Sequence, residues 1–320
     1  MAKPKNPIAA VTTWITPLAI SHPADLPTQV ATRLGCSARR ARATLAQLEA
    51  LGWLKRSGSE RKPQWSPGPL RQVVQRYTLA GLEEDLPWRR DFAPCFELAP
   101  NVARLAQHAF MELVNNAVDH SGGTTLAVSM RQTALHLHLL VSDDGIGLFE
   151  RVNGAHAISD PALAMFELAK GRLTSQPERH AGRGLFFVAR AADVFDLHAN
   201  RSAYQHRAFE GRGWMRTRAA ADRGTTVFVG IALDTERTLD SVMRSASSEG
   251  EGYAMDRARV PLRLLISQGV ALDSRAQARR VAARLAEFRR AELDFDGVAE
   301  IGHSFADELF RVLPTTHPQL

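Results

Sequence analysis

Four short stretches rich in glycine and acidic residues constrain the fold of this chain more than any other feature. In chain order they are Glu112-Leu-Val-Asn-Asn116, Asp143-Asp-Gly-Ile-Gly147, Gly182-Arg-Gly-Leu185 and Gly224-Thr-Thr226. Any one of them alone is a weak signal. Together, at these spacings, they predict a single nucleotide pocket.

The four stretches resemble the N, G1, G2 and G3 boxes of the GHKL superfamily, which includes gyrase B, Hsp90, MutL, sensor histidine kinases and anti-sigma-factor kinases. The resemblance covers about residues 96–233. It implies an ATP-binding domain of the Bergerat type, an α/β sandwich in which helices cover a mixed sheet, and it gives the whole chain the α+β class. The cofactors that it implies are ATP and Mg²⁺.

The first stretch lies on a long helix, predicted from Pro100 to His120 because proline suits the first helical position and Gly122 follows the end. Glu112 and Asn116 are four residues apart and Asp119 is three further on, so the three side chains share one face. A carboxylate there can take a proton from an attacking hydroxyl or water, and an amide oxygen can coordinate Mg²⁺. We therefore predict Glu112 as general base, Asn116 as metal ligand and Asp119 as a further nucleotide contact.

The other three stretches would hold the base and the phosphates. By match to the family pattern, Asp143 accepts a hydrogen bond from the adenine amino group, and the glycines after it let the backbone approach the base. The third stretch opens a helix whose amides can bind phosphate oxygens, and Thr226 is placed to reach the adenine edge. The nucleotide-binding residues predicted from these stretches are Asp143, Gly145, Gly147, Gly182, Arg183, Gly184, Leu185 and Thr226.

A polar run before the third stretch corresponds to the mobile lid of the family. A helix is predicted over 161–170, and the run covers 171–180. Further candidate phosphate contacts in this part of the chain are Lys170, Arg172, Arg179 and His180.

The positive charge is concentrated at the start of the chain. Residues 1–66 carry ten Lys or Arg and three acidic residues, a net charge of +7, whereas the rest of the chain has a net charge of −1. A compact basic domain suggests a polyanion partner, and DNA is the first candidate. The alternative is a solvated basic surface that keeps the chain soluble.

Two helices are predicted in this basic part, over 25–34 and 38–51, and Gly35 separates them. Residues 53–65 look like two strands joined by a basic loop. The segment resembles winged helix-turn-helix domains, which bind DNA and also serve as protein-interaction modules. Trp53 and Trp65 are predicted core anchors. The predicted DNA contacts are Arg39, Arg40, Arg42, Lys55, Arg56, Arg61 and Lys62.

Between the basic domain at 1–66 and the ATP-binding domain at 96–233, residues 67–95 are predicted as a helical connector that could take part in dimerisation. Its helices would cover 69–80 and 81–92. A hairpin is predicted from two alternating runs inside the ATP-binding domain. The strands expected there are 124–131, 135–142, 194–199, 209–217 and 225–233.

The chain after 233 is predicted as a loose linker over 234–257 and a small parallel α/β domain over 258–320. Its expected order is strand 260–266, helix 274–290, strand 291–296 and helix 297–311. Residues 258–318 resemble an uncharacterised STAS-like family, on the runs 274–279 and 305–311.

Ser304 occupies a place comparable to the phosphoacceptor serine of the STAS proteins that antagonise anti-sigma factors. The chain reads Gly-His-Ser-Phe there, instead of their Asp-Ser-Ser-Gly signature. Ser304 is therefore either a phosphoacceptor or a helix N-cap.

The leading functional hypothesis is a cytoplasmic regulator that couples ATP binding or slow hydrolysis to DNA binding, with the STAS-like domain as a docking module for a protein partner. A homodimer is part of this hypothesis. The first alternative is a serine kinase of the anti-sigma-factor type, and the second a non-catalytic scaffold stabilised by nucleotide. We expect no membrane association, because no apolar run reaches about 18 residues and no signal segment follows the N-terminus. Cys36 and Cys95 lack metal-site spacing.

Overall fold

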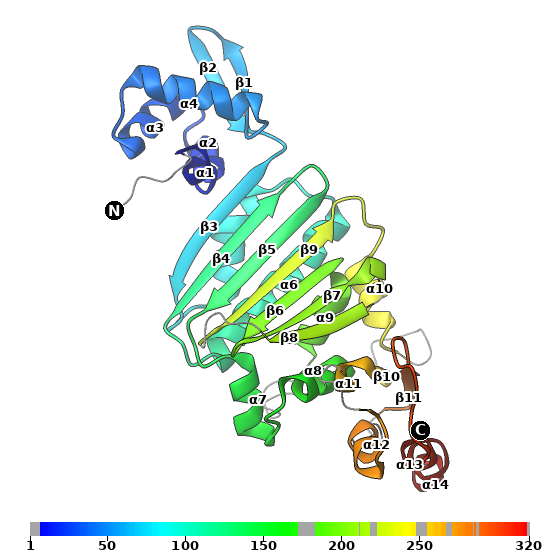
Figure 1. Ribbon diagram of the computed structural model, residues 1–320. Helices are drawn as coiled ribbons and strands as arrows, with labels where there is room; N and C mark the ends of the chain where they lie inside the picture. Colours follow the sequence, from blue (N-terminus) through cyan, green and yellow to red (C-terminus); the bar gives the residue numbers. More distant parts are fainter. Residues whose placement is uncertain are drawn as a thin grey trace.

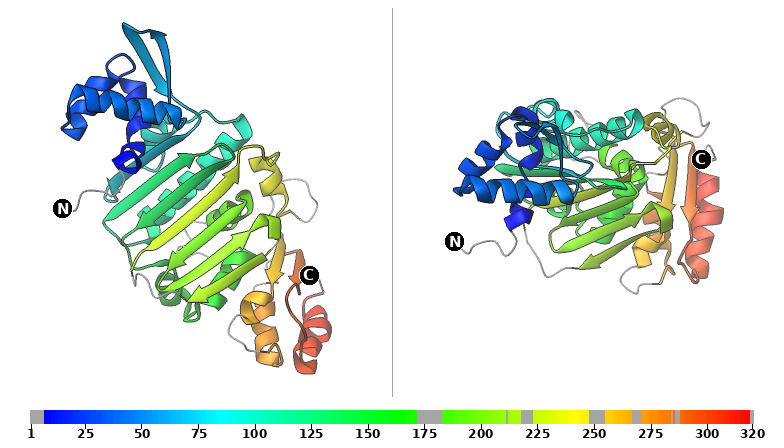
Figure 2. Two further views of the ribbon diagram at one scale, coloured as in Figure 1. Left: turned by 45° about the horizontal axis from the view of Figure 1, so that its top comes forward. Right: turned by 90° about the horizontal axis from the view of Figure 1, so that it is seen from above.

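A computed structural model describes residues 7–171, 183–210, 223–247, 255–266, 271–283, 285 and 288–318, and the backbone of 212–217. A central seven-stranded sheet separates two smaller parts of the molecule (Figure 1). The N-terminal helices and hairpin lie at one end, and the C-terminal α/β unit lies at the other. Both views in Figure 2 show the same separation.

The N-terminal part is built from four helices and a two-stranded hairpin. They are α1 (Pro7–Thr12), α2 (Ile15–Ser21), α3 (Leu26–Leu34), α4 (Ala38–Ala50), β1 (Leu54–Ser59) and β2 (Lys62–Pro67). Gly35 ends α3 with a left-handed backbone, at a φ of 59°, and the Ser37 hydroxyl caps α4 by accepting a bond from the Arg40 amide at 3.3 Å. The two predicted helices and the two predicted strands are present, while α1 and α2 were not predicted.

Aromatic side chains anchor this small core and join it to the sheet. Trp53 and Trp65 are 6% and 7% exposed and pack with the buried faces of the helices, as predicted. The guanidinium of Arg131, from the sheet, lies over the Trp53 ring at 5.5 Å. The Gln72 amide donates to the buried Thr16 hydroxyl at 3.1 Å. The N-terminal part is therefore packed against the central domain.

Every strand pairing described in the central sheet is antiparallel. This corrects the mixed sheet that we expected. The hairpin predicted from 124–131 and 135–142 is present as β4 and β5. In order across the sheet, the strands are β3 (Arg71–Thr78), β4 (Thr125–Gln132), β5 (His136–Asp143), β9 (Thr225–Ala232), β6 (Val194–Ala199), β7 (Ser202–Arg207) and β8 (Arg212–Thr217).

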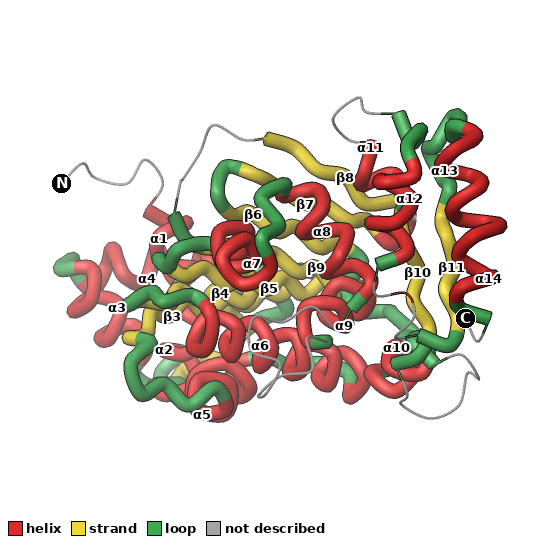
Figure 3. The backbone as a smooth tube through the Cα atoms, turned by 90° about the horizontal axis from the view of Figure 1, so that it is seen from below, coloured by secondary structure: helices red, strands yellow, loops and turns green. Residues whose placement is uncertain are grey.

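One face of this sheet is covered by helices, which makes the expected two-layer α/β sandwich. Figure 3 shows the three covering helices on the same side of the strands. The longest has the predicted bounds and begins with a proline, and its buried face includes Phe110 and Val114. The covering helices are α6 (Pro100–His120), α9 (Gly184–Ala191) and α10 (Leu239–Arg244).

The helix predicted over 69–80 is wrong, because these residues contain the edge strand β3. Arg71 and Val73 are buried while Val74 is exposed, a two-residue alternation typical of strands. Of the helix predicted over 81–92, the part from residue 85 is helical, continues to residue 95 and contacts α6, where the Trp88 and Phe110 rings lie 5.3 Å apart. These short helices are α5 (Asp85–Pro87), η1 (Trp88–Phe92) and η2 (Ala93–Cys95).

The predicted loose linker also contains structure that belongs to the sandwich. Helix α10 begins at a capping box formed by Thr238 and Ser241, and it packs on α6 and α9. The Asn101 side-chain amide donates to the carbonyls of Thr235 and Arg237, at 2.7 and 3.1 Å. The chain thus stays in contact with α6 for some distance after β9.

The C-terminal unit has two parallel strands flanked by helices, as predicted, but the helix expected over 274–290 is shorter and ends at Ala282. Its first strand ends at Pro261, which lacks the amide needed to continue the ladder, and a short helix follows instead of the strand expected up to 266. The last helix starts at His303, later than expected. The elements are β10 (Arg257–Pro261), α11 (Arg263–Ile266), α12 (Arg275–Ala282), β11 (Arg290–Asp294), α13 (His303–Asp307), η5 (Glu308–Val312) and α14 (Leu313–Thr316).

Two further helices follow β5 and connect the sandwich with the C-terminal unit. They are α7 (Leu148–His156), which was not predicted, and α8 (Pro161–Lys170), which has the predicted bounds. Helix α8 packs against both β10 and α11. As a result, the buried apolar residues of the sandwich and of the C-terminal unit form one continuous core.

Candidate functional site

Three glycines bring the four sequence stretches together. A Cβ on Gly145 would lie 2.2 Å from the Ser121 carbonyl oxygen just beyond α6, and one on Gly224 would lie 2.2 Å from the Asp143 carbonyl oxygen. A Cβ on Gly184 would lie 1.9 Å from a carboxylate oxygen of Glu112. At Gly145 and Gly224 the neighbour is backbone, so a larger residue would shift the chain, whereas at Gly184 it would displace the Glu112 side chain. The end of α6, the loop after β5, the start of α9 and the start of β9 therefore meet at one place.

Asp143 is held with one carboxylate oxygen bonded and the other available. Its Oδ1 accepts hydrogen bonds from the amides of Gly145 and Thr225, at 2.9 and 3.2 Å. Within the part of the chain that the structure describes, Oδ2 accepts none. Burial raises the pKa of Asp143 above its usual value of 3.8, against the opposing effect of the two amides. Oδ2 can therefore accept a hydrogen bond from a donor such as the adenine amino group.

The neighbouring Asp144 has a structural role in holding the loop. It accepts bonds from the amides of Thr124 and Thr125, at 2.7 and 2.9 Å, and from both hydroxyls. These bonds hold the pKa of Asp144 well below its usual range. Asp144 thus fastens the loop to the start of β4, which keeps Asp143 in position.

Asn200, which sequence reasoning missed, closes the other end of this loop. Its side-chain oxygen accepts from the amides of Phe149 and Glu150, both at 3.1 Å, and so holds the start of α7. Its amide nitrogen donates to the Ile146 carbonyl at 2.8 Å. Gly147 has a φ of 91° and leaves room for the Asn200 side chain. Asn200 itself has a positive φ, and no motif in the sequence identifies this residue as part of the site.

Glu112 and Asn116 lie on the partly buried face of α6, as predicted. The Glu112 Oε1 atom is 3.9 Å from Nδ1 of His108. Burial lowers the pKa of His108 below 6.5, which favours the neutral imidazole at pH 7 and leaves the carboxylate without a full countercharge from it. Among the described residues, the Asn116 carboxamide has no hydrogen-bond partner. Asp119, three residues on, is also partly buried.

The prediction for Thr226 does not fit the geometry. Thr226 points to the sheet face opposite the buried Val227, and its Oγ1 is 2.7 Å from the Ser142 hydroxyl. Side chains alternate along a strand, so Thr225 lies on the same face as Val227 and α6. The Thr225 amide already contacts Asp143. Thr225 directly follows Gly224 in the sequence, and this place could have identified it as the residue that faces the site.

The phosphate-binding side of the site is described only in part. Arg183 precedes α9 as its N-cap, Gly184 is the first helical residue, and Leu185 is half-buried. Gly182 lies outside the described residues, as do three candidate lid cations, Arg172, Arg179 and His180.

Lys170 is not a phosphate contact. Its side chain is 1% exposed, and its ammonium donates to Glu167 at 2.9 Å and to the carbonyls of Arg280 and Ala283 at the end of α12, at 3.4 and 3.1 Å. The last carbonyls of a helix lack partners within the helix, so a buried cation stabilises that end. Lys170 therefore joins α8 to the C-terminal unit.

The basic side chains predicted to contact DNA are all exposed. They lie in the first turn of α4 and on the hairpin, which contacts α4. The nearest acidic neighbour is Glu49, at 4.0 Å from Arg56. In the described chain the others have no ion pair. The exposed residues are Arg39, Arg40, Arg42, Lys55, Arg56, Arg61 and Lys62.

Ser304 is not the N-cap of its helix. Gly302 occupies the N-cap position of α13, and Ser304 is the second helical residue. The side chain is exposed, and its hydroxyl makes no hydrogen bond with any described residue. The structural role that we expected for Ser304 is therefore wrong, and its hydroxyl is accessible.

The residues at the nucleotide site fit a magnesium nucleotide. Asp143 offers an acceptor at the base end, the glycines leave space, and Asn116 offers an uncharged oxygen, which suits Mg²⁺. Among the described residues there is no group of three or more His, Cys, Asp or Glu side chains that could hold a metal ion.

No described helix is both long and apolar enough to cross a membrane.

Comparison with protein families agrees with this geometry. Residues 101–235 match the model of the histidine kinase-, DNA gyrase B- and HSP90-like ATPases. Residues 277–320 match a STAS-like domain of unknown function. No curated protein matches the chain. The chain therefore contains a GHKL ATPase domain followed by a STAS-like domain.

Proposed function

We propose that this protein is a regulator in which the state of an ATP site controls binding of the N-terminal part to DNA. The observation that carries the proposal is the close approach of three glycines, Gly145 to the residue after α6, Gly184 to Glu112 on α6, and Gly224 to Asp143. A basic surface on the same chain supplies the output. The fold resembles a winged helix at 25–67, whose second helix, α4, would enter the major groove.

At the site, Asp143 would bind the adenine amino group through Oδ2 while the amides of Gly145 and Thr225 hold Oδ1. Asn116 would hold Mg²⁺, which neutralises charge on the phosphates. Glu112 is the residue placed to accept a proton from a water molecule or hydroxyl. Its packing against Gly184 fixes the carboxylate beside the start of α9, where phosphate oxygens would bind.

The proposed DNA-binding surface would attract DNA electrostatically and fix the position of the protein on it. Arginines in the first turn of α4 and basic residues on the hairpin would contact phosphates, which orients the protein on the duplex. The contacts of the N-terminal part with β3 and β4, through Thr16 and Trp53, support a rigid connection to the ATPase domain. We propose that the protein acts as a dimer, so that nucleotide state changes the relative placement of two such surfaces.

The test is a fluorescence-anisotropy titration of DNA with the protein, alone and with Mg²⁺ and ATP. We expect the DNA dissociation constant to change about fivefold or more, a coupling of about 1 kcal/mol. Asp143→Asn should abolish the change, because the amides fix its oxygen at the Oδ1 position and turn its NH₂ group toward the adenine donor. Glu236→Gln, at an exposed position, is the matched control.

Equal DNA affinity with and without nucleotide, in protein that binds ATP by calorimetry, would remove the coupling. Failure of the wild-type protein to bind ATP at all would remove the whole proposal. Light scattering of the same samples measures the oligomeric state, and a monomer at all nucleotide conditions contradicts the dimer.

A second function is favoured by the accessibility of Ser304. Its hydroxyl is exposed, lies near the start of α13 and has no partner among the described residues. It could accept a phosphoryl group from the ATP site of another molecule, since α13 lies at the far end of the C-terminal unit (Figure 1). Incubation with labelled ATP tests this kinase activity. Label that appears on the wild-type protein and not on Ser304→Ala supports it, and unlabelled protein excludes it.

A further inference from the structure

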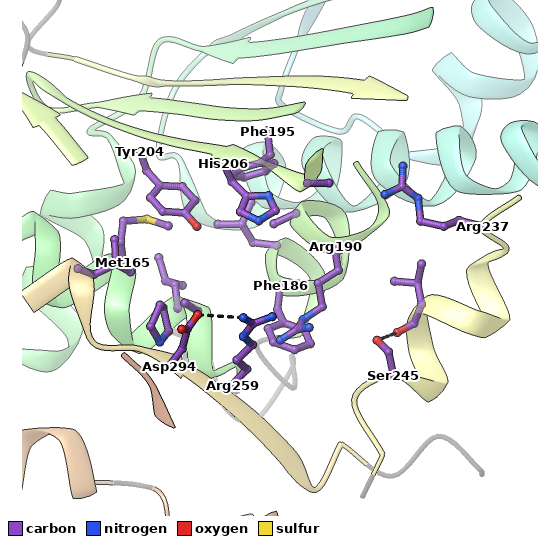
Figure 4. A pocket seen from close by; sticks show the side chains of 18 of the residues that line it. Met165, Phe186, Arg190, Phe195, Tyr204, His206, Arg237, Ser245, Arg259 and Asp294 are labelled. Carbon is purple, nitrogen blue, oxygen red and sulfur yellow. Dashed lines mark hydrogen bonds and ion pairs between the residues drawn. The ribbon is translucent and has the colours of Figure 1, made fainter. Parts of the chain in front are cut away.

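A cavity of about 490 Å³ lies between the ATPase domain and the C-terminal unit (Figure 4). Helices α8, α9 and α10 and strands β6 and β7 form one side, and β10, α11 and the end of β11 form the other. Most of the wall is apolar. Its apolar residues include Met165, Leu168, Leu185, Phe195, Val242 and Leu264. A cavity of this size is typical of small-molecule sites.

Three arginines reach this cavity, and two of them are neutralised by carboxylates. Arg259 bonds to Asp294 at 3.0 Å, and Arg237 pairs with Asp193. Arg190, the seventh residue of α9, has no carboxylate partner and no hydrogen bond among the described residues. Its guanidinium lies over the Phe186 ring at 4.1 Å, which holds it in the cavity. Among the described residues, Arg190 is therefore the arginine of this cavity that has no paired carboxylate.

Two neutral polar groups beside Arg190 also lack partners. Tyr204 is 7% exposed, and its hydroxyl makes no hydrogen bond in the described parts of the chain. The Nδ1 atom of His206 is buried and likewise has none. Figure 4 shows the Tyr204, His206 and Arg190 side chains entering the same space. Buried polar groups are normally satisfied, so the unpaired His206 Nδ1 atom beside two further polar groups that lack a described partner indicates a place for a ligand.

The electrostatics support an anion in particular. Burial, and after it the positive charges of Arg259 and Arg257, lower the pKa of Arg190 to about 10. Arg190 remains protonated at neutral pH despite this, and each of the two arginines affects its pKa more strongly than the opposing Glu292 carboxylate does. A partly buried cation in such surroundings is unfavourable. An anion bound against it would remove that unfavourable interaction.

We propose that this cavity binds a small organic monoanion, a carboxylic acid with an apolar body. The carboxylate would accept paired bonds from Arg190 and one from the Tyr204 hydroxyl, and the body would fill the apolar part beside Met165 and Leu264. A single negative charge matches the one cavity arginine that forms no ion pair in the described part of the chain. This site is separate from the nucleotide site, and its occupancy does not depend on the proposed function.

The test uses alkyl and aryl carboxylic acids of up to about twelve carbons, such as 4-phenylbutyrate, each paired with its neutral amide. Binding to the full-length protein is measured by isothermal titration calorimetry. We expect at least one acid to bind one molecule per chain, with its amide at least about tenfold weaker. Phenyl phosphate, a dianion, and inorganic phosphate are included to separate a carboxylate site from a phosphate site.

Arg190→Met removes the charge and keeps an apolar stem, and we expect it to weaken acid binding at least about tenfold. Tyr204→Phe removes only the hydroxyl and should weaken binding about two- to tenfold. Arg104→Met, at an exposed position on α6, is the matched control and should change nothing. Thermal unfolding separates a binding role from a structural one: without ligand, Arg190→Met should be as stable as the wild type or more stable.

Four results would overturn the proposal. These are the failure of every acid to bind, equal binding of acid and amide, unchanged acid binding by Arg190→Met, and tighter binding of phenyl phosphate than of any carboxylate. If Arg190→Met does not fold, Arg190 is structural, and the acid-to-amide comparison on the wild type with Tyr204→Phe still decides whether the cavity is an acid site.

Discussion

Replacing Lys170 by methionine should destabilise the protein by about 3–5 kcal/mol, because it leaves the buried Glu167 carboxylate without its countercharge. Both side chains are almost fully buried, at 1% and 8% exposure, and their charged atoms are 2.9 Å apart. The variant also removes the donor to the carbonyls of Arg280 and Ala283. The free energy of unfolding, from urea titrations followed by circular dichroism, measures this loss.

The double variant Glu167→Leu/Lys170→Met separates the two contributions. Replacing a buried ion pair by apolar side chains is often close to neutral, so the main remaining loss should be the two bonds to the α12 carbonyls, at about 0.5–1.5 kcal/mol each. The double variant should therefore lie about 1–3 kcal/mol below the wild type and above the single variant. Lys62→Met, at an exposed position, should stay within about 0.5 kcal/mol of the wild type.

Two results would refute this reasoning. A loss below about 1 kcal/mol in Lys170→Met would mean that the ion pair is solvated in solution rather than buried. A double variant no more stable than the single one would mean that the ammonium acts through its helix-capping bonds and not through Glu167.

Three further predictions concern the nucleotide site and the basic surface. Gly184→Ala should reduce the rate of ATP turnover at least about tenfold in a phosphate-release assay, since its methyl group displaces the Glu112 carboxylate, and an unchanged rate would contradict Glu112 as the base. Burial raises the pKa of Asp143 above 3.8, so the ionised side chain disfavours folding. Asp143→Asn should therefore be as stable as the wild type or more stable at pH 7, and the difference in stability should shrink as the pH falls toward 3.8. The opposite trend in thermal unfolding would overturn the direction of this pKa shift. The double variant Arg39→Ala/Arg40→Ala removes two phosphate contacts. It should reduce the steepness of the plot of log binding constant for DNA against log salt concentration by about 2, and an unchanged slope would mean that these residues do not contact DNA.

Local patterns in the sequence predict much of the sandwich. Helix α6 and strand β6 have the predicted bounds, because a proline start with a glycine after the end, or a short alternating run, is a local signal. Strand β3 could not be separated from a helix in the same way. Its eight residues pair with β4, far along the chain, and a short amphipathic run suits either structure until that partner is known.

The errors at the site have similar causes. Thr226 was preferred to Thr225 because the motif gives an order of residues but not which face of β9 each one takes, and the burial of Val227 decides that. The capping box of α10 was present in the sequence as Thr238 and Ser241, and was overlooked within a polar stretch. The cavity at Arg190 depends on how α8–α10 meet β10, a tertiary relation that no local pattern contains.

The continuous core shared by the sandwich and the C-terminal unit means that family boundaries and the physical folding unit differ in this protein. A fragment made of residues 101–235 alone would lack the edge strand β3 and the helix α10. It would also expose to water the side of α8 that packs on β10 and α11 in the whole protein. Such a fragment would offer an unpaired strand edge and an apolar surface to other molecules, so it should self-associate. Recombination that transplants this ATPase domain between proteins would therefore have to carry its neighbours with it.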